Sequence, residues 1–134
     1  MARHPHACEA LRLSSLLTDG ELLVLMASQR VAKSGASYRV FSRSDLEKPS
    51  VLRPLLVLRE ALPQCLAGLV RKGMLVRRGR QGFEATTPGN TVKHTFNEAA
   101  HSLLLGPAGA ALRDRRHEWR AVLRDEVQRI CRHQ

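Results

Sequence analysis

One stretch of the sequence indicates how the centre of the chain folds: LPQCLAGLVRKGMLVRRGRQGFEATTPG, residues 62–89. In its first half, Leu66, Leu69 and Val70 recur at the spacing of one buried helix face. Pro63 stands at the start of this segment, where the first turn of a helix tolerates proline. The segment therefore predicts a helix that begins near Pro63.

The second half of the same stretch predicts a β-hairpin. Gly73 suits the left-handed residue that follows a helix. Residues 74–78 and 83–87 are two short runs rich in strand-forming side chains, and the four residues 79–82 between them begin and end with glycine. Glycine permits the backbone angles of a tight turn, so the two runs are expected to pair.

Upstream, the sequence predicts two helices. Thr18 and Glu21 have the spacing of a capping box, in which each side chain binds the backbone N–H of the other residue. A Leu-rich run follows, and we expect a helix over residues 19–33. A shorter helix is expected before it, at residues 8–16.

Between this helix and the hairpin, the sequence predicts a strand and further helical turns. Residues 37–41 contain Tyr, Val and Phe, which favour a short strand. Residues 42–45, Ser-Arg-Ser-Asp, have the composition of a helix start. Residues 51–61 are Leu-rich and predict another helix.

The last third of the sequence predicts two helices, one of them long. Thr95 and Glu98 form a second capping-box pattern, which predicts a helix over 95–105. A final helix is expected over 108–132. Its apolar face is longer than so small a core can cover, so we expect a homodimer. The residues expected at the dimer interface are Leu112, Trp119, Leu123, Val127 and Ile130.

Composition and charge favour a polyanionic partner. The 134 residues include 43% hydrophobic and 4% aromatic residues, which favours a mostly helical domain with little sheet. Lys and Arg number 22 against 12 Asp and Glu, for a net charge of +10. Residues 61–93 hold six basic side chains and one acidic side chain. This local excess indicates a surface that faces nucleic acid.

The motifs resemble those of winged helix–turn–helix transcriptional regulators of the MarR and PadR type. Residues 66–78 resemble the junction between recognition helix and wing in these families, and residues 83–89 resemble the end of the wing. Residues 18–25 resemble the first core helix. The resemblance implies a mostly α fold with a small β-hairpin wing and a long C-terminal dimerisation helix. It divides the chain into an N-terminal arm or helix (1–17), a DNA-binding domain (18–93) and a dimerisation segment (94–134).

The resemblance implies that double-stranded DNA is bound by the wing and by one recognition helix. Two positions remain possible for the first residue of that helix. The recognition helix begins near Ser50 or near Pro63. The first choice makes Arg53 a groove residue, and the second makes Gln64 one. In the second case Gln64, Ala67, Gly68 and Arg71 are expected on the exposed helix face. The candidate DNA-binding residues are Arg39, Arg43, Arg53, Arg59, Gln64, Arg71, Lys72, Arg77, Arg78 and Arg80.

Other chemistries lack their sequence signals. We find no catalytic or phosphate-loop motif, and no metal-ligand or cofactor pattern, so we expect neither an enzyme nor a resident cofactor. The three cysteines are widely spaced, which predicts no disulfide framework and a reducing compartment. Cys65 is interpreted as a buried hydrophobe rather than a redox sensor, and Trp119 as a core or interface residue rather than a ligand-stacking one.

The leading hypothesis is a dimeric, sequence-specific transcriptional regulator in the cytoplasm, associated with the nucleoid and not with a membrane. One alternative is an architectural, partition or replication protein of a plasmid or phage that uses a winged helix. Another is a winged helix that binds protein instead of DNA. The sequence does not indicate an effector ligand.

Overall fold

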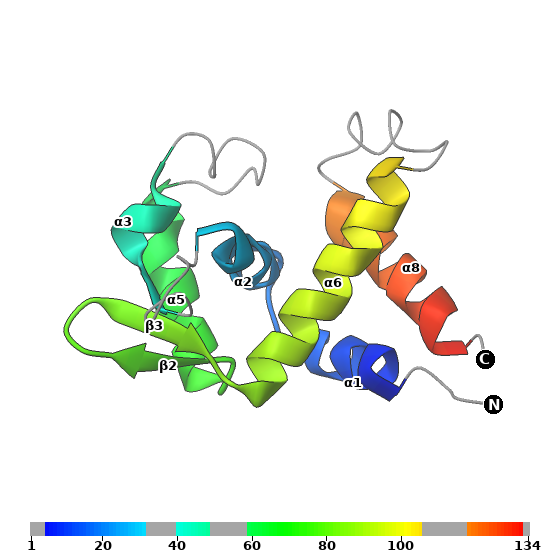
Figure 1. Cartoon of the computed structure of the whole chain (residues 1–134), viewed down its shortest axis with the longest axis horizontal. Coiled ribbons are helices and arrows are strands. Elements are labelled where there is room, and N and C mark those ends of the chain that lie inside the picture. The colour runs from blue at the N-terminus through cyan, green and yellow to red at the C-terminus, as the bar shows by residue number, and fades with distance from the viewer. Residues whose placement is uncertain (1–4, 32–39, 49–58, 106–117, 133–134) are drawn as a thin grey trace.

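The computed structural model describes residues 5–31, 40–48, 59–105 and 118–132, and the fold within them is mostly helical with one small sheet (Figure 1). The elements in chain order are α1 (Pro5–Ser14), α2 (Asp19–Val31), β1 (Val40–Ser42), α3 (Arg43–Leu46), the 3-10 turn η1 (Arg59–Ala61), α5 (Leu62–Arg71), β2 (Leu75–Arg78), β3 (Gly82–Ala85), α6 (Thr87–Leu105) and α8 (Trp119–Arg132). The α+β class expected from the sequence is confirmed at this level.

The helices divide between the two ends of the molecule in Figure 1. At one end α1 packs against both α6 and α8, and α6 also contacts α8. At the other end α3, α5 and the sheet lie together. Helix α2 stands between the two groups, because it packs on α5 and on α6. Its apolar side chains Leu22, Val24 and Leu25 are completely buried.

The sheet has three antiparallel strands in the order β1-β3-β2. Phe83 of β3 pairs with Phe41 on one side and with Arg77 on the other. Because side chains alternate between faces, the two phenylalanines share the face that covers the core, and their ring centroids are 5.9 Å apart. The hairpin turn contains Gly79 at φ +66°, a backbone angle that L side chains rarely adopt. The predicted hairpin is thus confirmed, although its second strand covers Gly82–Ala85 instead of residues 83–87.

Two capping boxes fix the starts of α2 and α3. The backbone N–H of Thr18 donates to Glu21 Oε1 (2.9 Å), and the N–H of Glu21 donates to Thr18 Oγ1 (3.2 Å). Ser42 and Asp45 exchange the same pair of bonds at α3. Both starts were expected from local sequence, because a capping box needs only residues three apart.

Helix α5 ends as its sequence predicts. Gly73 lies at φ +81°, and its N–H donates to Val70 O (3.1 Å). The N–H of Met74 donates to Leu69 O (2.9 Å). These two bonds form a Schellman motif, which satisfies carbonyl groups of the last turn and directs the chain into β2.

Helix α6 corrects the prediction of a helix over 95–105, because it begins eight residues earlier, at Thr87. Thr86 caps it: its Oγ1 accepts from the N–H of Gly89 (3.2 Å) and donates to Gly73 O (2.6 Å). Pro88 falls in the first turn, where no N–H is needed. Thr95 therefore lies inside a continuous helix, which also runs through the expected division at 93/94.

The predicted helix over 108–132 is described only from Trp119 onward, as α8, and Leu112 lies outside the described residues. Leu123 and Val127 are completely buried within this one chain. Trp119 and Ile130 are partly buried against the same core. Two of the expected interface residues are therefore covered by the chain's own helices, so the homodimer stays a prediction that Leu123 and Val127 do not support.

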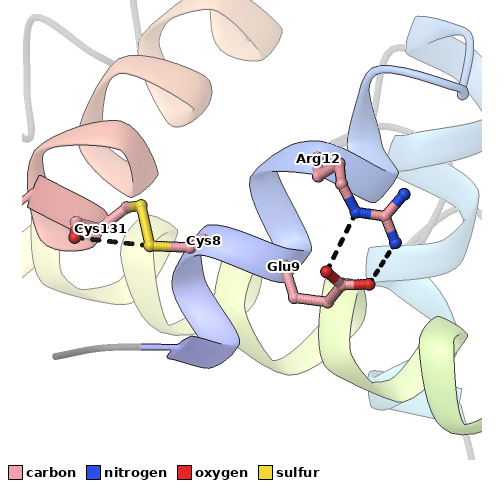
Figure 2. Close-up of a disulfide and its surroundings, with 4 residues drawn as sticks. All are labelled: Cys8, Glu9, Arg12 and Cys131. Carbon is pink, nitrogen blue, oxygen red and sulfur yellow. Dashed lines mark hydrogen bonds and ion pairs between the residues drawn. A yellow bond between two sulfur atoms is a disulfide. The ribbon is translucent and has the colours of Figure 1, made fainter.

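A disulfide joins the first and last described helices and corrects the expectation of unpaired cysteines (Figure 2). Cys8 of α1 is bonded to Cys131 of α8, across 123 positions of sequence, and Cys65 is free. Such bonds are typical of oxidising compartments, which weighs against the reducing, cytoplasmic location expected from the sequence. Within the described part of the chain, no helix has both the length and the apolar character to cross a membrane.

Candidate nucleic-acid interface

The exposed face of α5 carries part of the predicted site. Gln64 and Arg71 are exposed, whereas Leu66 and Leu69 are buried. Gly68, expected on the exposed face, is buried instead, and a Cβ there would lie 1.9 Å from Glu21 Oε2 of α2. Position 68 of α5 faces α2. Because glycine has no side chain, the Glu21 carboxylate can lie close to the backbone there. The polar face of α5 is therefore narrower than its sequence suggested.

The hairpin separates arginines that are neighbours in the sequence. Arg78 Nε donates to Glu84 Oε1 of the adjacent strand (2.7 Å), so its charge is paired on one face of the sheet. Arg77 points to the opposite face, where its guanidinium carbon lies 5.4 Å from the centre of the Phe83 ring. No carboxylate pairs with Arg77 among the residues that the structure describes. Arg80 is exposed in the turn.

Glu47, just after α3, forms ion pairs with two of the predicted DNA-binding arginines. Arg59 Nε donates to its Oε2 (2.6 Å) and Arg43 Nε to its Oε1 (3.1 Å). The hydrogen bond from Arg59 contributes most to holding the Glu47 pKa below its usual value, against the opposing effect of burial. Arg43 and Arg59 remain largely exposed. Each therefore keeps N–H groups that a second anion can bind.

Lys72 uses its charge within the fold. Its Nζ lies 2.5 Å from Glu21 Oε1, and the Glu21 side chain is only 6% exposed. Burial by itself raises the pKa of Glu21, but the hydrogen bonds from Lys72 and from the Thr18 backbone outweigh it and lower the pKa. This ion pair links the start of α2 to the end of α5, so Lys72 positions α5 and is less available to a phosphate than the sequence suggested.

A cavity of about 380 Å³ lies where α3, α5 and the hairpin meet. Its lining combines apolar side chains with hydroxyl, amide and charged groups: Ser42, Arg43, Ser44, Glu47, Pro63, Leu66, Ala67, Arg77, Gln81 and Phe83. Arg43 and Arg77, 34 positions apart in the sequence, thus face one space. Sequence reasoning missed Ser44, Glu47 and Gln81 as members of the site. For Glu47 a signal existed, because it stands four residues after Arg43 in a helical turn.

Two of the predicted DNA-binding residues, Arg39 and Arg53, lie outside the described residues, as do residues 51–58 of the predicted helix that would carry Arg53. The structure thus gives α5 a described, exposed face but does not decide between the two possible starts of a recognition helix. Gln64 lies on α5, next to Pro63 of the cavity wall. The described members of the predicted set therefore lie at one end of the molecule.

Cys65 and Trp119 have the surroundings expected of packed side chains. Cys65 is 9% exposed, and its pKa is raised first by burial and then by the nearby Glu21 carboxylate. A raised pKa keeps the sulfur a thiol at neutral pH, which makes it a poor redox sensor. Trp119 packs against the core at the start of α8.

Comparisons with known protein families, with curated proteins and with solved structures found no match.

Proposed function

We propose that the protein is a winged helix–turn–helix protein that binds double-stranded DNA, and that it acts as a homodimeric transcriptional regulator. The observation that carries the proposal is the order α2-β1-α3-α5-β2-β3 together with the strand order β1-β3-β2. In a winged helix the helix before the hairpin enters the major groove and the hairpin contacts the flanking backbone. Helix α5, directly before the hairpin, and the hairpin itself are the corresponding elements in this chain, which supports the proposal.

The distribution of exposed charge supports the same proposal. Arg71 on α5 and Arg77, Arg78 and Arg80 on the hairpin are all exposed. Exposed guanidinium groups on adjacent elements suit binding to phosphates, which contribute most of the affinity for DNA of any sequence. Gln64, exposed in the first half of α5, is the candidate for reading a base edge.

The test is DNA binding by the full chain with its disulfide intact. Genomic fragments bound by the protein are recovered, and the best site is footprinted. A short protected palindrome supports the regulator, and sedimentation of the free protein is expected to give a dimer. Extended coverage without a preferred site would contradict sequence-specific binding, and a lack of salt-sensitive binding would contradict DNA binding altogether.

A charge-matched pair of variants makes the test specific. The triple variant Arg77→Ala, Arg78→Ala, Arg80→Ala removes three positive charges from the hairpin. The control Arg12→Ala, Arg129→Ala, Arg132→Ala removes three exposed charges from α1 and α8 at the other end of the molecule. The hairpin variant is expected to lower the slope of log K against log salt by about 0.9 for each phosphate that the hairpin no longer neutralises. Equal losses in both variants would show that the hairpin has no special role.

A further inference from the structure

The cavity between α3, α5 and the hairpin has the size and lining of a ligand site. Its volume of about 380 Å³ falls in the range of about 300–1,000 Å³ that is usual for small-molecule sites. Pro63, Leu66 and Ala67 of α5 supply an apolar wall, and Phe83 of the sheet supplies another. Polar groups converge on the same space from α3 and the hairpin, so a ligand here would have one apolar and one polar side.

The charges around the cavity favour an anion. Arg43 and Arg77 line it, and Glu47, the one carboxylate among the described lining residues, is bound by Arg43 and Arg59. Among the residues that the structure describes here, three guanidinium groups against one carboxylate leave a positive balance. Arg77 lies over the Phe83 ring with no acidic partner among the described residues. A guanidinium over an aromatic ring keeps its N–H groups for an oxyanion, and its forked geometry matches phosphate.

The neutral groups of the lining add donors. Ser42 Oγ and Ser44 Oγ lie 2.8 Å apart, so one hydroxyl donates to the other. The hydroxyl that accepts keeps its own proton for a ligand. Gln81, in the turn of the hairpin, adds an amide that both donates and accepts.

We propose that this cavity binds one nucleotide unit, with its phosphate held by Arg77 and Arg43 and its sugar or base against Pro63, Leu66 and Ala67. The phosphate can come from a DNA backbone or from a free mononucleotide, which carry the same chemistry. If the phosphate belongs to DNA, the inference rests on the proposed function and identifies Arg77 as the hairpin arginine that binds it. If it belongs to a free mononucleotide, the cavity binds a ligand other than DNA.

The variants compare an arginine of the cavity with an exposed arginine far from it. Arg77→Ala removes a guanidinium from the cavity, and Arg132→Ala, its matched control, removes an exposed one from α8 at the other end of the molecule. Ala67→Phe fills the cavity without a change of charge. Arg77→Lys keeps the charge but loses the forked geometry, and thermal unfolding checks that each variant is folded.

Two titrations are made with each full-length variant, one with a fluorescent DNA duplex of mixed sequence and one with thymidine monophosphate, with thymidine as the phosphate-free control. Arg77→Ala is expected to weaken binding of at least one probe by about tenfold or more, the loss expected for a charge-assisted hydrogen bond. Ala67→Phe is expected to weaken binding of the same probe because it fills the cavity. Arg132→Ala is expected to change binding much less, because Arg132 lies on α8 at the other end of the molecule. Loss for the duplex alone assigns the phosphate to DNA, and loss for thymidine monophosphate assigns the cavity to a free nucleotide.

The outcomes separate this inference from the proposed function. If Arg77→Ala, Ala67→Phe and wild type bind both probes equally, or if Arg132→Ala matches Arg77→Ala, the inference is overturned, whereas DNA binding by the wild type still supports the proposed function. If the wild type binds thymidine monophosphate but no duplex, the proposed function fails and the inference holds. If thymidine binds as well as its phosphate, or the wild type binds neither probe, the inference is overturned. Where Ala67→Phe does not fold, Arg77→Ala and Arg77→Lys decide.

Discussion

The two ends of the molecule use their side chains differently. At the end formed by α1, α6 and α8, the apolar residues Phe96, Leu123 and Val127 are completely buried, and a disulfide joins the first helix to the last. At the end formed by α3, α5 and the hairpin, arginines are exposed around a cavity that Arg77 lines without an acidic partner among the described residues. The contrast suggests that the first end stabilises the fold and that the second is left available for binding.

The test with the largest expected change in unfolding free energy is removal of the disulfide. Cys8→Ser, or reduction of the bond, is expected to lower the free energy of unfolding by up to about 5 kcal/mol, because the bond closes a loop of more than a hundred residues. Denaturant unfolding of the oxidised and reduced protein measures the effect. Cys65→Ala in the oxidised protein is the control for loss of a sulfur atom alone. Equal stability with and without the bond would contradict the assignment of stability to this end.

A second test concerns the apolar packing of α8. Leu123→Ala is expected to cost about 3–4 kcal/mol of unfolding free energy, because Leu123 is fully buried and its removal leaves a cavity. Ile130→Ala, at a partly buried position of the same helix, should cost less. Denaturant unfolding gives both values, and sedimentation shows whether either variant alters assembly. A change of assembly with unchanged stability would show that Leu123 faces a second chain.

A third test concerns the contact between α5 and α2, the helix that lies between the two ends. Gly68→Ala places a Cβ where the Glu21 carboxylate lies and is expected to cost about 1–3 kcal/mol, because the carboxylate is held by Thr18 and Lys72 and cannot move freely. Thermal or denaturant unfolding measures it. Ala67→Gly, one position earlier on α5, controls for helix propensity. If Gly68→Ala were as stable as the wild type, the close packing of α5 on α2 would be refuted.

The test with the smallest expected change concerns how the stability of the fold depends on pH through Glu21. The Glu21 pKa is lower in the folded protein than its usual value of 4.5, so its stabilising effect is complete above about pH 4.5 and is lost as the pH falls through the folded pKa. Glu21→Gln cannot ionise. The stability difference between wild type and Glu21→Gln should therefore shrink by roughly 1 kcal/mol between neutral and acidic pH, the net value of one hydrogen bond. A difference independent of pH would contradict the ion pair with Lys72.

The elements predicted correctly depend on residues close together in the chain. The capping boxes at Thr18 and Ser42 and the helix end at Gly73 involve partners three to five positions away. The start of α6 was missed because two local signals compete. Thr95 matches a capping box, but Thr86 gains a further bond to Gly73, and this contact between segments favours the longer helix. Local pattern alone cannot rank the two starts.

The candidate site likewise depends in part on contacts that local sequence patterns do not reveal. Alternation along a strand already places Arg77 and Arg78 on opposite faces, so their separation could have been inferred from the predicted hairpin. Which of the two is paired depends on Glu84 in the other strand. The meeting of Arg43 with Arg77, and of Lys72 with Glu21, requires the packing of distant elements and has no local signal.

The sequence by itself determined the order of the described helices and strands, the capped starts of α2 and α3, the end of α5 and the basic character of the chain, because capping, turn and alternation rules act over a few residues. The tertiary structure decided which charges remain available: it paired Arg78 with Glu84 and Lys72 with Glu21, and turned Arg77 toward the cavity. It also joined Cys8 to Cys131. Each of these outcomes depends on contacts between segments far apart in the chain, which form only when the core packs.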